Sequence, residues 1–211
     1  MASILGEVVR GVGRTFLLGT AALLLSAESC DDNKKRGESQ INGDVSVSFE
    51  GDGGISVRVL GRDERTQTDS SGNFSLEDRV AGPLTLLFDR SDGVSADLDV
   101  PPFPRGSVVQ LDDIEIDAFD SHATYGTASL SFSGRVTEVD CANATIFVEG
   151  KIEPRDGEFA VRTTDARISD RNDDVVNCTT VRVGDAVNVR GRLETNGGIT
   201  RASVSDRDVP R

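Results

Sequence analysis

The acidic residues Asp113, Glu115 and Asp117 alternate with apolar residues in the segment 111–117. In an extended strand, alternate side chains lie on one face at intervals of about 7 Å, so the three carboxylates would share a face. Calcium prefers carboxylate oxygens as ligands, which makes these residues candidates for a metal site. A charged strand face that protects a sheet edge is the commoner use of such a pattern. We therefore expect neither a bound metal nor another cofactor.

The groups that a nucleophilic enzyme needs are sparse. His122, the one histidine of the chain, lies in the polar stretch 120–126, where we expect a solvated side chain. Gly-x-Ser-x-Gly, His-Glu-x-x-His and P-loop motifs do not occur after residue 30. The sequence thus favours a non-enzymatic protein. Because the chain has 36 Asp and Glu residues, an accessory hydrolase that uses surface carboxylates remains the alternative.

A nucleic-acid surface would need exposed aromatic rings and a basic groove. In the second half of the chain, the candidates for such a surface are the aromatic residues Tyr125, Phe132, Phe147 and Phe159 and the arginines Arg190, Arg192 and Arg201. Three of the four aromatic residues fall in strand patterns, where they would belong to a core. The formal net charge of −13 also opposes phosphate binding. We expect no nucleic-acid partner.

Residues 1–29 have the features of a signal peptide. Two arginines precede the uncharged run Thr15–Ala27, which at 13 residues is too short to span a bilayer. The polar segment 30–40 offers no apolar residue before Ile41 and is predicted to be a flexible tether. We therefore expect an exported protein.

The tetrapeptide Ala27-Glu28-Ser29-Cys30 resembles a bacterial lipoprotein box. It departs from the family pattern, which has a Leu-like residue at the position of Ala27 and a small residue at that of Glu28. The resemblance implies acylation of Cys30, a lipid anchor on a membrane surface, and a place in the bacterial cell envelope. The same Ala-x-Ser sequence also satisfies the rule for ordinary secretory cleavage, which would give a secreted protein.

The rest of the chain divides into two modules of unlike charge. Residues 41–123 carry 17 acids and 6 bases, whereas residues 124–211 carry 14 acids and 12 bases. Apolar residues alternate with polar ones throughout, and turns rich in Gly and Asp separate these runs, which indicates short antiparallel strands. The predicted fold class is all-β. We place a sandwich at 41–120, a linker at 121–128 and a barrel at 129–207.

The segments Thr68–Leu76 and Gly82–Phe88 give the first module its likeness to a known family. Thr-Asp-Ser-Ser-Gly-Asn-Phe-Ser-Leu, followed by Gly-Pro-Leu-Thr-Leu, resembles the hairpin signature of the carboxypeptidase regulatory-like, or transthyretin-like, domain. Leu84 takes the place of the usual Tyr. The resemblance implies a small β-sandwich that acts as a spacer or interaction module, with Asp69 as a turn former.

The second module resembles a bacterial OB-like domain family of unknown function. Five segments carry the resemblance: Phe132–Val139, Thr145–Gly150, Phe159–Val161, Val183–Gly191 and Gly198–Val204. They imply a five-stranded barrel, in which Gly134 and Gly191 would let the strands bend at the corners. Residues 170–180 are rich in Asp and Asn, so we expect a loop where an OB fold usually has a helix.

Cysteine usage predicts a disulfide between Cys141 and Cys178. With Cys30 at the lipid position, these two remain within one module of an exported chain, and oxidising compartments favour disulfides. The OB resemblance places Cys141 after the first strand and Cys178 before the fourth, and those strands are antiparallel neighbours. Two free thiols that happen to share a module are the alternative.

These observations together predict a non-enzymatic binding or spacer protein of the bacterial cell envelope. A lipid anchor on a membrane surface and a carbohydrate or protein ligand are the expected partners. The accessory hydrolase is the second hypothesis, and an OB-type nucleic-acid binder is the third.

Overall fold

The computed structural model describes residues 38–47, 53–93, 95–116, 121–152, 155–170, 172 and 174–206. These residues form β-strands and one short 3₁₀ turn, with no α-helix among them, so the all-β prediction is confirmed. None of the helical structure in the described part is long and apolar enough to cross a membrane. The predicted signal peptide, Cys30 and most of the tether lie outside the described residues.

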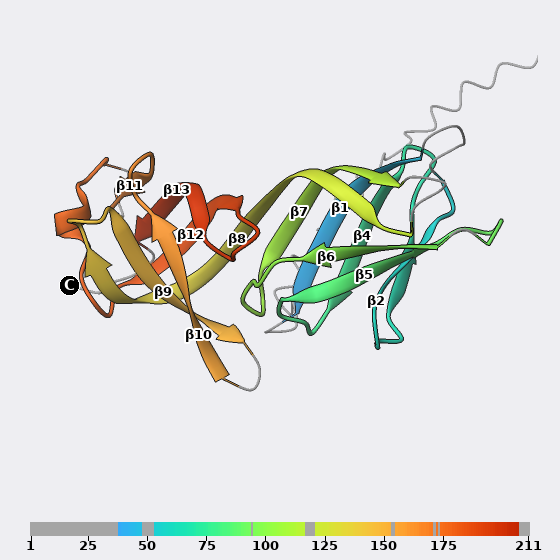
Figure 1. The fold of residues 1–211 in the computed structure, drawn as a ribbon. Helices are drawn as coiled ribbons and strands as arrows, with labels where there is room; N and C mark the ends of the chain where they lie inside the picture. The colour runs from blue at the N-terminus through green and yellow to red at the C-terminus, as the bar shows by residue number, and fades with distance from the viewer. Residues whose placement is uncertain are drawn as a thin grey trace, which may run out of the picture. The chain divides into compact units, whose positions relative to one another are not determined.

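The first module is a β-sandwich of two sheets (Figure 1). Its own strands are β1 (Ser39–Val47), β2 (Ser56–Val59), β3 (Arg65–Gln67), β4 (Asn73–Asp78), β5 (Leu84–Asp89), β6 (Ser95–Val100) and β7 (Val108–Ile116). One sheet contains β4, β1 and β7, and continues into β8 (Ala123–Asp140); the other has the order β3-β2-β5-β6. Strands β1 and β7 are parallel, whereas the other neighbouring pairs among β1 to β8 are antiparallel.

The alternation of apolar and polar residues along the sequence accounts for these two layers. In β4, every second residue is buried, beginning with Phe74 and Leu76. The ring of Phe74 packs edge to face against the ring of Phe88, which belongs to the opposite sheet. The two ring centroids are 5.9 Å apart. Burial of alternate apolar residues on two facing sheets supplies the hydrophobic stabilisation of the module.

Strand β8 joins the two modules and is 18 residues long. Its first half pairs with β7 from Ile116↔Ala123 to Val108↔Ser131, and its second half pairs with strands of the second module (Figure 1). The linker expected at 121–128 is therefore strand from Ala123 onward. The small polar residues that we interpreted as a linker alternate across β8, and their backbone groups hydrogen-bond with β7.

The second module is built on a ring of five strands. Besides the end of β8, these are β9 (Thr145–Ile152), β10 (Arg155–Arg162), β12 (Ala186–Leu193) and β13 (Ile199–Asp206). Pairing follows the order β8-β9-β10-β13-β12, and β12 pairs again with β8; the β10–β13 contact is parallel. A short strand, β11 (Arg167–Ser169), adds to β13, and the 3₁₀ turn Cys178–Thr180 lies in the segment for which we expected a loop.

Gly134 and Gly191 lie where neighbouring strands come very close together. A Cβ atom built on Gly134 would collide with the backbone oxygen of Glu149 on β9, and one on Gly191 would lie 2.5 Å from a methyl carbon of Ile199. Neither glycine has a positive φ angle. The two glycines therefore allow close approach between strands, rather than an unusual backbone conformation.

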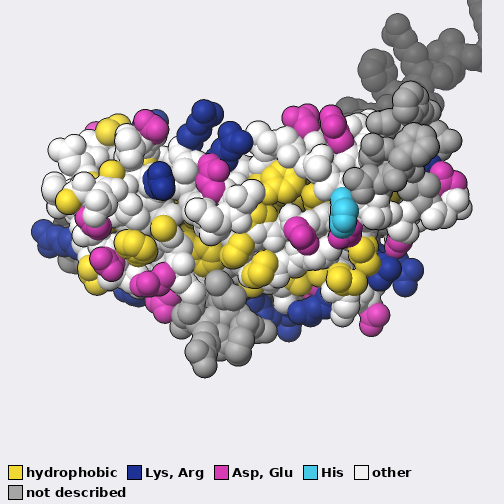
Figure 2. All heavy atoms as spheres, in the orientation of Figure 1, with side chains coloured by type: hydrophobic (Ala, Val, Ile, Leu, Met, Phe, Trp, Pro, Cys, Tyr) yellow, Lys and Arg dark blue, Asp and Glu magenta, His cyan; other side chains and the backbone are white. Residues whose placement is uncertain are grey.

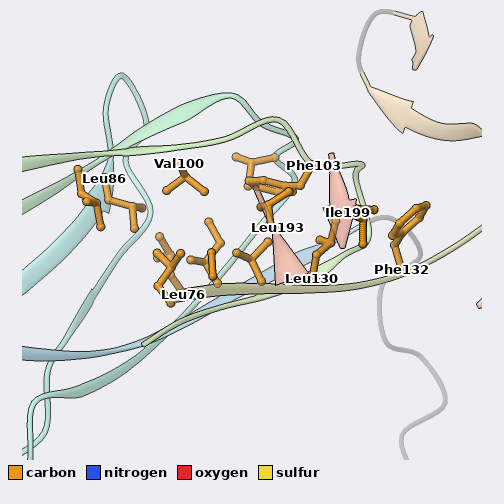
Figure 3. Packing of buried hydrophobic residues seen from close by; sticks show 14 of the residues in the cluster. Leu76, Leu86, Val100, Phe103, Leu130, Phe132, Leu193 and Ile199 are labelled. Atoms are coloured by element: carbon orange, nitrogen blue, oxygen red, sulfur yellow. The ribbon is translucent and has the colours of Figure 1, made fainter. Parts of the chain in front are cut away.

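Buried apolar side chains form one cluster through both modules. Figure 3 shows Leu130, Leu193 and Phe103 in the stretch between Leu86 of the sandwich and Phe132 of the ring. Each of these five side chains is at most 4% exposed. The continuous core and the shared strand β8 fix the residues at the junction of the modules, where the candidate site lies.

Candidate functional site

The acidic strand predicted as a weak metal candidate contains a bulge. Two residues, Asp112 and Asp113, separate buried Leu111 from buried Ile114, and Asp113 has a φ of 57°. Its backbone N–H donates to Asp44 Oδ2 at 3.2 Å. Asp113 and Glu115 are both exposed, and Asp117 lies outside the described residues. No group of three or more His, Cys, Asp or Glu side chains in the described part could hold a metal ion.

The disulfide prediction is confirmed. Cys141 follows β8 directly, and Cys178 begins the 3₁₀ turn that precedes β12. Their Cα atoms are 5.8 Å apart and their sulfur atoms are bonded. Because β8 and β12 are antiparallel neighbours, the end of one strand lies beside the approach to the other, as the OB resemblance implied.

The aromatic and basic residues considered for nucleic-acid contact are not brought together. Phe132 and Phe159 are buried, with ring centroids 5.6 Å apart, while Phe147 is half-buried. Arg190 lines a groove on the outer surface of the ring, whereas Arg192 lines a groove beside Tyr125, because the pairing register of β12 with β13 shifts between the two arginines. Arg201 lines neither of these grooves. These arginines therefore do not form one basic track.

A groove around Tyr125 is the best candidate for a functional site. A hollow of about 500 Å³ is lined by residues of β6, β8 and the end of β12, among them Asp97, His122, Tyr125 and Glu194. A second hollow of about 460 Å³ shares Asp99, Tyr125 and Thr195 with the first. Its remaining wall is largely apolar: Pro83, Leu84, Val100, Pro101 and Pro102. We call the two hollows together the Tyr125 groove.

Tyr125 is placed by the β8 strand that joins the modules. It pairs with Ile114 of β7, and its half-buried side chain packs against the core cluster. Burial raises the pKa of the Tyr125 hydroxyl above 10.0, and the negative charge of Glu194 raises it further. The hydroxyl therefore stays protonated at neutral pH and can donate a hydrogen bond.

His122 is paired with a carboxylate, and its side chain is still largely exposed, as its sequence context predicted. His122 Nδ1 lies 2.5 Å from Asp97 Oδ1, and the backbones of the two residues form an isolated bridge. The histidine side chain is still 69% exposed, and Figure 2 shows it (cyan) beside acidic side chains (magenta). The two residues are far apart in sequence, so no local pattern could reveal this contact.

Two carboxylates of the groove, those of Asp99 and Glu194, are held by neighbouring hydroxyls. Thr85 Oγ1 donates to Asp99 Oδ1 at 2.8 Å, and Thr200 Oγ1 donates to Glu194 Oε1 at 2.6 Å. Each carboxylate has further lone pairs that can accept hydrogen bonds. An aromatic ring with a protonated hydroxyl, flanked by fixed acceptors, is suited to a ligand with hydroxyl groups and an apolar face.

Comparison with known proteins does not assign the chain to a family. No protein-family model and no curated protein matches the chain. Among solved structures, the chain is similar to one in the type II cohesin–X-dockerin complex from Acetivibrio cellulolyticus, with 15% sequence identity and a TM-score of 0.30. That match covers 42% of this chain and 59% of the other.

Proposed function

We propose that the protein is a non-enzymatic binding protein of the bacterial cell envelope, and that the Tyr125 groove binds a neutral carbohydrate chain. The observation that carries the proposal is the juxtaposition of Tyr125 with Asp97, Asp99 and Glu194 in one groove. An aromatic ring can pack on the C–H face of a sugar while carboxylates accept hydrogen bonds from its hydroxyls.

The architecture supports a binding role. We propose that the first module is a carboxypeptidase regulatory-like sandwich and that the second is an OB-like barrel. The parallel contact between β10 and β13 and the return of β12 to β8 support the second assignment. OB barrels bind oligosaccharides as well as oligonucleotides. The net charge of −13 favours the sugar over the nucleic acid.

Export and a lipid anchor at Cys30 complete the proposal. They rest on the sequence of residues 1–30, with its basic start, short apolar run and lipoprotein-like box. An acylated Cys30 would hold the two modules outside the cytoplasm on a polar tether. A ligand on the cell surface or in the periplasm would then be within reach.

The groove contains the only tyrosine of a chain that has no tryptophan. Intrinsic fluorescence therefore reports on Tyr125 directly. The proposal predicts that, in a panel of neutral oligosaccharides, at least one changes the tyrosine emission in a saturable way. Calorimetry with the same sugar should give the same affinity. No response from any neutral sugar in either assay would overturn the proposal.

Two variants test the assignment to the groove. Tyr125→Ser and Asp99→Asn should each weaken sugar binding, measured by calorimetry, whereas Leu60→Ser should not. Leu60 is the matched control because it is a large, exposed apolar residue outside the groove. Melting curves of the three variants separate loss of binding from loss of fold.

The second hypothesis, an accessory hydrolase, uses carboxylates of the same groove. It predicts that the full chain releases reducing ends from the bound sugar and that Asp97→Asn or Asp99→Asn abolishes this turnover. The non-enzymatic proposal predicts the reverse, namely binding without turnover. A hydrolysis rate that these changes eliminate would replace the leading proposal.

A further inference from the structure

A second groove, of about 660 Å³, lies on the outer surface of the five-stranded ring. Its floor is the outward face of β8, β12, β13 and β11. Strand register arranges this floor in two cross-strand rows. One row is Ser131, Arg190, Ser203 and Arg167, and the next is Ser133, Asn188, Ser205 and Ser169. Gly106 and Val108, at the start of β7, form the wall on the sandwich side.

The groove carries positive charge in an acidic protein. Arg190 and Arg167 are separated by β13, so their backbones lie about 10 Å apart, at two strand spacings. Among the residues that the structure describes, no acidic one lines the groove. Neither arginine forms an ion pair with the residues that the structure describes. Two guanidinium groups on one row thus face a polar hollow without an internal counter-ion.

The other side chains of the floor both donate and accept hydrogen bonds. Ser133 Oγ donates to Asn188 Oδ1 at 2.7 Å, which orients the Asn188 amide and leaves its N–H groups for a ligand. The serine hydroxyls on the two rows can pair with alcohol groups in either direction. A ligand that fits this surface has negative charges at intervals and hydroxyls between them.

Peptide binding by strand addition is blocked at β12 and β13, the two central strands of this floor. At Ser131, β8 is already paired with both β7 and β12, and β13 is paired with both β12 and β11. Their backbone groups are therefore satisfied, and a ligand must be recognised by side chains.

We propose that this groove binds a linear acidic polysaccharide through its sugar carboxylates. Each guanidinium can hold one carboxylate through two parallel hydrogen bonds, and the rows of serine and Asn188 contact the intervening hydroxyls. The groove shares no lining residue with the Tyr125 groove, so the proposal is independent of the neutral-sugar site.

Calorimetry of the full chain with polygalacturonate at low ionic strength tests this assignment. We expect binding that weakens with added salt. The double variant Arg167→Gln/Arg190→Gln should lose about tenfold or more in affinity, because hydrogen bonds to charged groups are among the strongest in proteins. The double variant Arg167→Lys/Arg190→Lys keeps the positive charge but loses the paired hydrogen bonds of the guanidinium groups. Its affinity should lie between that of the wild type and that of Arg167→Gln/Arg190→Gln.

The matched control is Arg62→Gln/Arg162→Gln, which changes the net charge equally at two exposed arginines outside the groove. It should bind as the wild type does. Equal losses in both double variants, or no binding of polygalacturonate at all, would overturn the proposal. Equal affinity for polyglutamate would overturn the assignment to a sugar acid. Tyr125→Ser should leave polygalacturonate binding unchanged, which separates this site from the neutral-sugar site.

Discussion

Cys141 and Cys178 connect the end of β8 to the turn that leads into β12, with their Cα atoms 5.8 Å apart. Between them along the chain lie β9, β10 and β11. The bond therefore ties the start of the 3₁₀ turn, at Cys178, to the end of the strand that joins the modules.

Removing this bond should destabilise the protein. The sequence separation is 37, and closing a loop of that length contributes about 4 kcal/mol in the chain-entropy model. We expect the double variant Cys141→Ala/Cys178→Ala to lose up to this amount in urea unfolding without reductant. Cys30→Ser, which keeps the bond, should match the wild type. Equal midpoints for the wild type with and without reductant would contradict this prediction.

Alternation of apolar residues indicated strands in both modules, while the resemblance to an OB-like family implied the five strand segments of the ring and, together with the cysteine count, the disulfide. The contacts that make the Tyr125 groove could not be predicted in this way. Asp97 lies in β6 and His122 directly precedes β8, so what brings them together is the course of β8, the first residues of which the sequence pattern predicts as a linker. Likewise, Arg167 and Arg190 share a row only through the register of β11, β13 and β12.

The bulge at Asp113 shows a second limit of pattern reading. Alternation in the segment 111–117 predicts carboxylates on one face and an unbroken strand, whereas the structure has a bulge at Asp112 and Asp113, where two polar residues separate buried Leu111 from buried Ile114. Nothing in the residue types marks this position, because Asp at a positive φ is tolerated without a glycine.

Gly134 should not tolerate a side chain. Because a Cβ atom there would collide with the backbone oxygen of Glu149, Gly134→Ala should destabilise the fold by about 1–3 kcal/mol, measured by urea unfolding. Gly126→Ala is the control on the same strand. Its Cβ would meet only the side chain of Asp113, at 3.1 Å, which can move. Similar losses at both glycines would show that close approach is not the cause.

Asp69 should make stability depend on pH. Hydrogen bonds from the backbone N–H groups of Asn73 and Ser71 hold the pKa of its carboxyl below the ordinary value of 3.8. A lowered pKa in the folded state contributes stability above pH 3.8, which is lost as the pH falls through the folded pKa. Asp69→Ala should therefore be less stable than the wild type at neutral pH, and the difference should shrink in acid.

Equilibrium unfolding of the two proteins over this pH range measures the effect. Asp63→Ala, at another exposed aspartate outside the strands, is the control and should change little at any pH. A difference between Asp69→Ala and the wild type that is constant from neutral to acidic pH would show that turn geometry, and not the charge, accounts for the role of Asp69.

Cys30 should decide where the protein resides. If it is acylated, the wild type expressed in a bacterial host should partition into detergent, whereas Cys30→Ser should be released or remain uncleaved. A lipid anchor holds stably when more than one chain is attached, with about 0.8 kcal/mol for each buried CH₂ group. Wild-type protein that is fully soluble, with an unmodified cysteine, would be an ordinary secreted protein.

The hydroxyl of Tyr125 should titrate above pH 10.0, because burial raises its pKa and the charge of Glu194 adds to the shift. It is the only tyrosine, so ultraviolet absorbance during alkaline titration follows this one group. Glu194→Gln should lower the titration midpoint of Tyr125 towards 10.0. The midpoint should still stay above 10.0, because burial is the larger cause of the raised pKa. Because a raised folded pKa favours the folded state below the unfolded value, stability should fall as the pH rises past 10.0.

Unfolding in urea should return the titration midpoint of Tyr125 to its ordinary value in both the wild type and Glu194→Gln.

The same titration in the presence of a bound neutral sugar connects Tyr125 to the proposed site. A ligand that covers Tyr125 excludes water from its hydroxyl and should raise the midpoint further. If a bound sugar leaves the titration midpoint of Tyr125 unchanged, the sugar binds elsewhere on the molecule. If Tyr125 titrates at 10.0 in the folded protein without sugar, its side chain is more exposed than the groove requires.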